Sequence, residues 1–257
     1  MNVLEELNIF YNNFSQEKGY IGTTEMGKPI PFLLVKKTPF PRIIVQYSIH
    51  AREYITTYLA MQQILHYQKY GKSGSVYFIP AVNLDGIEKV LNGNPLYKAN
   101  INGVDLNVNF DANWGTGKTN IRYKNFENYI GEKPFSESET IALKNFTLSV
   151  MPHATISYHS KGEEVYWEFF QQPNDRKRDE YLAQKLARAT GYSLKSTPDS
   201  AGGYKDWCIQ KLKIPAFTIE VGDDNLTHPI QKKHLPEIFD KNKEVINTLI
   251  ESLGELI

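Results

Sequence analysis

Short apolar runs alternate along this chain with stretches whose apolar residues recur at helical spacing, and this alternation limits the folds open to it. Strands that alternate with helices form a sheet that is at least partly parallel, with helices on both faces. We therefore predict an α/β fold with a mixed, mostly parallel sheet of about eight strands. The clearest predicted strands span residues 30–35, 42–49, 76–79, 154–158, 165–170 and 216–221. The predicted helices span residues 1–18, 54–67, 179–190 and 236–256.

A further helix and a long loop are indicated in the middle of the chain. Ser136 and Glu139 have the spacing of a capping box, with Ser136 as N-cap, and predict a helix that runs to about residue 150. Residues 91–133 are rich in Asn and Gly and predict an irregular segment. Irregular segments of this length inside a compact domain usually carry function.

Composition narrows the class of protein. A chain of 257 residues suits one domain, which we expect to cover residues 1–257. Lys plus Arg and Asp plus Glu number 29 each, so no global charge favours nucleic acid or an anionic membrane as a partner. Cys208 is the only cysteine and excludes an internal disulfide. The N-terminus has no signal-peptide pattern, so we expect a cytoplasmic protein without a membrane partner.

Three polar residues follow predicted strands: His50, His159 and Glu220 each lie at a strand's carboxyl end, where sites gather in such sheets. His50 and Glu53 lie three residues apart and could share one zinc ion, with His159 as the third protein ligand of a catalytic site. Each residue also has a simpler interpretation. The histidines could be ordinary hydrogen-bonded residues, Glu53 a carboxylate at a helix N-terminus, and Glu220 a buried ion-paired carboxylate.

Six segments in a fixed order sharpen this interpretation, because together they resemble the zinc metallocarboxypeptidase family over most of the chain. The pattern His-x-x-Glu is present at residues 50–53, and Asn-x-Asp-Gly at 83–86. The remaining segments are Gly-Val-Asp-x-Asn-x-Asn at 103–109, His-Ser at 159–160, Gly-Gly-x-x-Asp-Trp at 202–207 and Thr-x-Glu at 218–220. Within the family, residues 98–107, 135–140 and 201–207 are most similar to the γ-D-glutamyl-L-diamino acid endopeptidases.

The resemblance implies roles for individual residues. His50, Glu53 and His159 would bind Zn²⁺, and Glu220 would be the general base that takes a proton from water. Asp105 matches the carboxylate that orients the first histidine ligand.

Three further residues match substrate-binding or catalytic positions of the family. Arg52 and Asn107 match residues that hold the substrate. Lys98 stands where digestive relatives have an arginine that stabilises the oxyanion, although it could equally be a solvated loop lysine.

Three departures from the family pattern concern specificity. Val108 replaces the arginine that clamps a C-terminal carboxylate, so removal of ordinary C-terminal residues should be poor. The loop before Gly202 lacks the tyrosine that caps the substrate, and Tyr204 could take its place. Lys205 stands at the base of the side-chain pocket and suits an acidic group, although it could also be an exposed loop lysine.

The resemblance therefore implies a zinc peptidase that hydrolyses the γ-D-glutamyl-meso-diaminopimelate bond of peptidoglycan stem peptides. The substrate partner would be a peptide or muropeptide. One alternative is a cytosolic carboxypeptidase that removes acidic C-terminal residues. Another is a relative without zinc that only binds muropeptides, against which the intact set of ligands argues. The sequence leaves the oligomeric state open.

Overall fold

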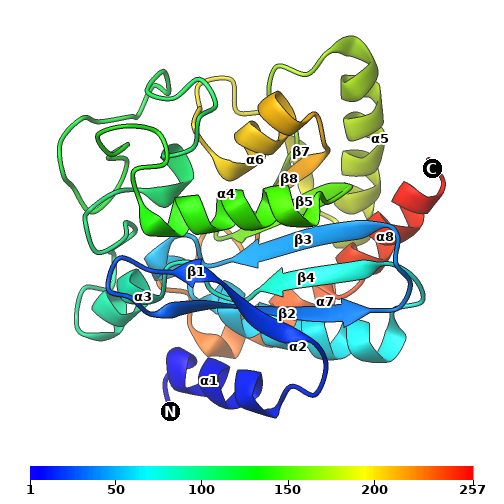
Figure 1. The fold of residues 1–257 in the computed structure, drawn as a ribbon, viewed down its shortest axis with the longest axis horizontal. Helices are drawn as coiled ribbons and strands as arrows, with labels where there is room; N and C mark the ends of the chain where they lie inside the picture. The colour runs from blue at the N-terminus through cyan, green and yellow to red at the C-terminus, as the bar shows by residue number, and fades with distance from the viewer. Residues whose placement is uncertain (257) are drawn as a thin grey trace.

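The computed structural model describes residues 1–256, so Ile257, the last residue of the predicted domain, lies outside the described part. Its centre is one eight-stranded sheet in the order β1-β2-β4-β3-β5-β8-β6-β7 (Figure 1). The strands are β1 (Lys18–Thr23), β2 (Pro29–Lys36), β3 (Arg42–Tyr47), β4 (Ser75–Ile79), β5 (Ala154–His159), β6 (Glu164–Tyr166), β7 (Ser193–Lys195) and β8 (Ala216–Glu220). The predicted α/β class and mixed sheet are confirmed.

Four neighbouring strands, β4, β3, β5 and β8, run parallel at the centre of the sheet, whereas β1, β2 and β6 join by antiparallel pairing. Central parallel strands are covered on both faces, which explains the nearly continuous apolar run in β3. The register pairs His159 directly with Glu220. It also aligns Gln46, Ser157 and Thr218 in one row across β3, β5 and β8.

Helices cover the two faces of the sheet in different ways (Figure 1). The largest cluster of buried hydrophobic residues lies between one face of the sheet and the helices α1, α2, α5, α7 and α8. A second cluster lies between the other face and the helices α4 and α6. The segment between α3 and α4, green in Figure 1, gathers at the carboxyl end of β3 and agrees with the predicted irregular segment. The helices are α1 (Val3–Asn13), α2 (Ile55–Tyr70), α3 (Leu84–Leu91), α4 (Ser138–Val150), α5 (Pro173–Thr190), α6 (Tyr204–Trp207), α7 (Leu235–Asn242) and α8 (Val245–Gly254).

The predicted capping box at Ser136 is wrong by one residue. The N-cap of α4 is Glu137, and its side chain makes no cap hydrogen bond. The Ser136 hydroxyl is already engaged: it accepts from Asn109 Nδ2 at 3.0 Å and donates to Glu137 Oε1 at 2.6 Å. The loop that precedes the helix therefore takes the hydroxyl that a capping box would need.

The single long C-terminal helix predicted at 236–256 is wrong as well, because the chain forms α7 and α8 with a break after Asn242. The backbone carbonyl of Asn242 accepts a hydrogen bond from Gln63 Nε2 at 2.8 Å. The buried Asn242 side chain donates to the Tyr192 hydroxyl at 2.9 Å. These tertiary contacts replace the helical hydrogen bond at this point, and helical spacing in the sequence does not reveal them.

Element boundaries differ elsewhere by a few residues. The first helix ends at Asn13 and not near residue 18, and α5 begins at Pro173 and not at residue 179. The short elements α3 and β7 were not predicted. No helix within residues 1–256 combines the length and the apolar character needed to cross a bilayer. The cytoplasmic location stays a prediction.

Candidate active site

A single turn of 3₁₀-helix, Ala51–Glu53, brings His50 and Glu53 together at the end of β3. Residues three apart nearly eclipse each other in 3₁₀ geometry, so both side chains leave the turn on the same side. His50 Nδ1 lies 2.9 Å from Glu53 Oε1, and both residues are buried. The spacing seen in the sequence thus corresponds to a real contact.

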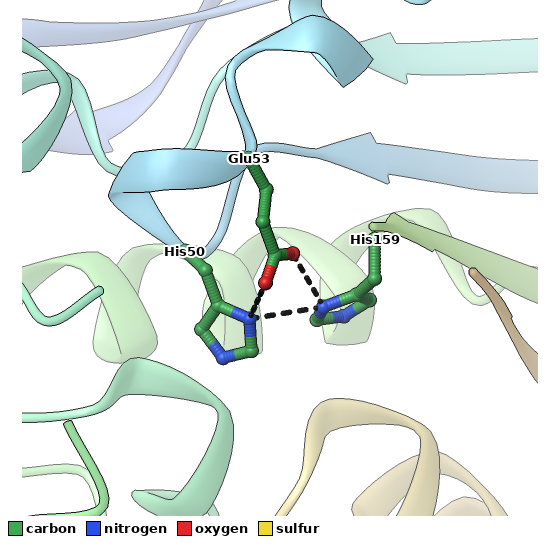
Figure 2. Close-up of side chains that lie close together, drawn as sticks. All are labelled: His50, Glu53 and His159. Atoms are coloured by element: carbon green, nitrogen blue, oxygen red, sulfur yellow. Dashed lines mark hydrogen bonds and ion pairs between the residues drawn. The ribbon is translucent and has the colours of Figure 1, made fainter. Parts of the chain in front are cut away.

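His159 reaches the same point from the end of β5. Its Nδ1 lies 3.1 Å from His50 Nδ1 and 3.1 Å from Glu53 Oε2, and Figure 2 shows the three side chains converging. Two ligand atoms of one tetrahedral zinc ion are separated by roughly 3.3 Å, given bonds of about 2.0–2.2 Å. Two imidazole nitrogens and a carboxylate at these separations therefore form a set that could hold a metal ion. Burial would raise the pKa of Glu53, but both histidines oppose it and hold that pKa well below its usual value.

Asp105 fixes the first histidine from the other side of its ring. Asp105 Oδ1 lies 3.1 Å from His50 Nε2, and Asp105 Oδ2 lies 2.7 Å from the ammonium of Lys98. Burial would raise the pKa of Asp105, but Lys98 and His50 overcome this effect and keep the pKa well below its usual value. An ionised Asp105 makes Nε2 the protonated nitrogen and leaves Nδ1 of His50 free to bind a metal.

Glu220 ends β8 beside His159, its partner in the sheet register. Its Oε2 is buried and has no hydrogen-bond partner among the described residues. Burial raises the pKa of Glu220 to about 8, an effect that His159 opposes and Glu53 reinforces. A buried carboxylate with a raised pKa beside residues that could hold a metal ion could act as a general base.

A pocket of about 180 Å³ extends from Glu220 to Lys205. Lys205 is only 6% exposed, so the alternative that it is an exposed loop lysine is wrong. Its Nζ donates to Asp206 Oδ1 at 2.5 Å and to the backbone carbonyl of Glu168 at 3.0 Å. The other lining residues are Asn107, Tyr166, Thr197, Ser200, Gly203, Asp206 and Thr218.

Asn107 lines this pocket, and its short 3₁₀ turn, Leu106–Val108, packs on the Gly202–Gly203 backbone. Gly202 has φ +87°, and a Cβ there would lie 2.8 Å from the carbonyl oxygen of Val108. Only glycine allows so close an approach in this conformation. Asn107 Oδ1 then accepts from the Tyr204 backbone N–H at 3.1 Å, which ties the turn to α6.

The structure places Tyr204 in the core and not over the pocket, which corrects the suggestion that it could cap the substrate. Its side chain has no exposed surface, and its hydroxyl lies 2.8 Å from Thr147 Oγ1 on α4. The ring packs edge-to-face on Phe110. Tyr204 is the first residue of α6 and packs toward α4, whereas the next residue, Lys205, lines the pocket.

Arg52 lies on the same 3₁₀ turn as Glu53. Its Nη1 donates to Glu127 Oε2 and to the backbone carbonyl of Leu96, both at 3.2 Å. Its side chain keeps 19% of its surface exposed. The irregular segment between α3 and α4 therefore contributes Glu127 as a partner for Arg52. It also contributes Lys98 and Asp105, and Asp105 holds the ring of His50.

Sequence reasoning gave no role to two residues that the structure brings to the site. Asp206 was noted only as part of a motif, yet it contacts Lys205 in the lining of the pocket. His228 lies in the loop after β8, and its Nδ1 is buried without a partner in the described chain. Burial lowers the pKa of His228, with Glu53 and Arg52 close enough to influence it. The only sign of His228 in the sequence was its position in the loop that follows the strand ending at Glu220.

Comparison with known proteins points to the same family that the sequence motifs resemble. Residues 2–245 match the family model described as zinc carboxypeptidase. γ-D-Glutamyl-L-diamino acid endopeptidase 1 of Lysinibacillus sphaericus is 30% identical over 248 residues, which cover 82% of this chain and 62% of that relative. Murein peptide amidase A of Escherichia coli strain K12 is 31% identical over 150 residues, 54% of each chain.

Solved structures extend the likeness to the fold. Bovine thrombin-activatable fibrinolysis inhibitor, in complex with a tick carboxypeptidase inhibitor, superimposes with a TM-score of 0.85. The match covers 99% of this chain and 96% of that one at 21% identity, so it speaks for the fold alone. With the family model matching nearly the whole sequence, the chain belongs to the zinc carboxypeptidase family of metallopeptidases, a family of hydrolases.

Proposed function

We propose that this protein is a zinc peptidase that hydrolyses the γ-D-glutamyl-meso-diaminopimelate bond of peptidoglycan stem peptides. One observation carries the proposal: the converging set of His50, Glu53 and His159 stands beside Glu220, and Glu220 also lines a pocket whose lining includes the buried Lys205. The names of two relatives, a γ-D-glutamyl-L-diamino acid endopeptidase and a murein peptide amidase, support peptidoglycan peptides as the substrate class.

His50 Nδ1, His159 Nδ1 and a Glu53 carboxylate oxygen would hold the zinc ion. Bound there, zinc would supply Lewis-acid polarisation of the scissile carbonyl and would make water acidic enough to act as a nucleophile near neutral pH. Asp105 contributes by holding the ring of His50 in the orientation and tautomer that present Nδ1.

Glu220 would move the proton. Its Oε2 has no hydrogen-bond partner among the described residues, and Glu220 pairs with His159 in the sheet register, so a water held near His159 would be within its reach. It would take a proton from that water and pass it to the nitrogen of the leaving amine. The amino group of diaminopimelate then departs as a neutral amine, and the γ-carboxylate of D-glutamate is released.

Lys98, Arg52 and Asn107 would act on the substrate itself. Lys98 is anchored through Asp105 but keeps 18% of its side chain exposed, so one of its three N–H donors can serve a developing oxyanion. Arg52 and Asn107 flank the zinc ligands and the pocket, respectively, and can donate to polar groups of the peptide.

Val108 favours this reaction over ordinary removal of C-terminal residues. It follows Asn107 on the short 3₁₀ turn beside the pocket, where a valine offers no donor to a terminal carboxylate. A charge-assisted hydrogen bond is one of the stronger contributions to carboxylate recognition, and its loss would weaken a carboxypeptidase substrate. The proposed substrate uses a carboxylate at the end of its side chain instead.

Digestion of L-Ala-γ-D-Glu-meso-diaminopimelate by the zinc-loaded protein tests the proposal. Mass spectrometry should detect L-Ala-D-Glu and free meso-diaminopimelate as the only products. A peptide of α-linked residues ending in glutamate serves as comparison. Faster hydrolysis of that peptide would replace the proposal with an acidic-residue carboxypeptidase, and zinc loading without hydrolysis of either peptide would indicate a binding protein.

A further inference from the structure

The lining of the pocket includes a buried ion pair and not a lone cation, and we call this pair of Lys205 and Asp206 the pocket floor. Lys205 and Asp206 are only 6% and 3% exposed, and Nζ lies 2.5 Å from Oδ1. Their charges cancel, so the pocket floor carries a positive and a negative group side by side with no net charge. Desolvating such a pair costs free energy that mutual attraction only partly offsets, so a buried pair of this kind calls for a reason other than stability.

Both members of the pair keep unused hydrogen-bonding capacity. Two of the three Lys205 donors go to Asp206 and to the Glu168 carbonyl, which leaves one. Asp206 accepts from Lys205 on Oδ1 and from the Gly203 backbone N–H on Oδ2 at 3.0 Å, while a carboxylate has about four acceptor positions. Both residues line the pocket, so an entering ligand can reach both of them.

A side chain with a single charge fits this floor poorly. A carboxylate that approaches Lys205 also approaches Asp206, and the repulsion offsets much of the attraction. A lone ammonium that approaches Asp206 meets Lys205 in the same way. A group with an ammonium and a carboxylate on one carbon can place each charge against its opposite, so four charges alternate in sign.

We propose that Lys205 and Asp206 together recognise a zwitterionic amino-acid end on the substrate side chain, with the carboxylate against Lys205 and the ammonium against Asp206. The inference rests on the proposed function, in which the leaving residue is meso-diaminopimelate, and it assigns a partner to each charge of its distal end. Asp206 is then a specificity residue as well as the residue that holds the Gly203 N–H at the start of α6.

Four tripeptides of the form L-Ala-γ-D-Glu-X test this with the unmodified, zinc-loaded protein. X is meso-diaminopimelate, L-lysine, L-2-aminopimelate or L-2-aminoheptanoate, which present a zwitterion, a cation, an anion and no charge at the end of the side chain. We expect kcat/KM for the zwitterion to exceed that for each other peptide by about tenfold or more, the discrimination typical of one buried charged contact.

Two variants then separate the two contacts. Asp206→Asn keeps an acceptor for the Gly203 N–H and should lower the preference for diaminopimelate over aminopimelate. Lys205→Met should lower the preference for diaminopimelate over lysine. The pair Asp240→Asn and Lys243→Met is the matched control, since Asp240 and Lys243 form an ion pair of the same 2.5 Å length on the surface at α7.

The outcomes distinguish the two levels of the argument. Hydrolysis of the aminopimelate peptide as fast as the diaminopimelate peptide would overturn the zwitterion inference and leave Lys205 as a simple carboxylate contact. Equal rates on all four peptides would overturn it also, while the proposed cleavage of γ-D-glutamyl bonds would stand. Failure to hydrolyse any of the four would overturn the proposed function and the inference with it.

Discussion

The ammonium of Lys98 lies 2.7 Å from Oδ2 of Asp105, the carboxylate whose other oxygen contacts His50. A lysine at this position can act in two ways. It can stabilise the ionised Asp105 and so position His50, or it can use its remaining donors on the oxyanion of the substrate. These roles predict different losses when the ammonium is removed.

Lys98→Met separates the two roles. If the ammonium stabilises the oxyanion, kcat should fall by about 10²–10³ while zinc affinity stays within a fewfold of the original value. Asp105→Asn provides the comparison, because loss of an orienting carboxylate lowers metal affinity by roughly 10–100-fold. Zinc affinity and steady-state kinetics on the stem tripeptide measure both effects. If Lys98→Met loses zinc as Asp105→Asn does, the lysine is a positioning residue.

Glu220→Gln should retain zinc and lose activity. The amide keeps the size of the side chain but cannot accept the proton of water, so kcat should fall by about 10²–10⁴. Zinc content by elemental analysis and kcat on the tripeptide are the measurements. Glu251→Gln on α8, an exposed glutamate distant in the fold, is the control. Activity of Glu220→Gln within tenfold of the original would remove Glu220 from the proton-transfer step.

Zinc should stabilise the folded protein through the three converging residues. A ligand that binds only the folded state adds about 2.7 kcal/mol at a free concentration of 100 times Kd, so Tm should rise with added zinc. His159→Ala should abolish this rise, because it removes a ligand from the end of β5. Differential scanning calorimetry of chelator-treated protein, with His234→Ala as control, is the test. An equal zinc-dependent rise in His159→Ala would exclude His159 as a ligand.

A second acidic group predicts how stability depends on pH. Glu139 on α4 is fully buried and lies near Glu25 and Glu137. Burial raises its pKa to about 7, helped by the charge of Glu25, although backbone and Asn100 donors oppose the shift. Between about pH 4.5 and pH 7, the Glu139 carboxyl therefore stays protonated in the folded protein but is ionised in the unfolded chain. Stability should be highest below about pH 4.5 for this group and decline as pH rises to about 7, by about 3 kcal/mol in all.

Glu139→Gln should flatten this part of the stability curve, because glutamine does not titrate. Urea unfolding of both proteins at pH 5 and pH 8 measures the difference, with Glu17→Gln, a change at an exposed site, as control. The original protein should lose stability between the two pH values by more than Glu139→Gln does. Parallel losses would show that Glu139 is ionised in the folded state below pH 7.

Periodicity was a good guide wherever local sequence and tertiary contacts agree. Most residues of β2, β3, β4, β5 and β8 are buried, and the apolar residues among them made these strands recognisable in the sequence. Prediction failed where a hydrogen bond from a residue far away in the sequence determines the local structure. Asn109 takes the hydroxyl of Ser136, and Gln63 takes the carbonyl of Asn242, so a cap and a helix predicted from local pattern are both lost.

The sequence by itself determined the fold class, the family and the residues that could bind a metal. Their identity lies in short ordered motifs, and the strand pattern already places His50, His159 and Glu220 at one edge of a parallel sheet. Only the tertiary structure decided which side chains face each other. It sends Tyr204 into the core, joins Lys98 to Asp105, and buries Lys205 against Asp206. The physical reason is that a side chain's environment comes from residues far away in the chain, and a loop sequence carries no periodic signal for such contacts.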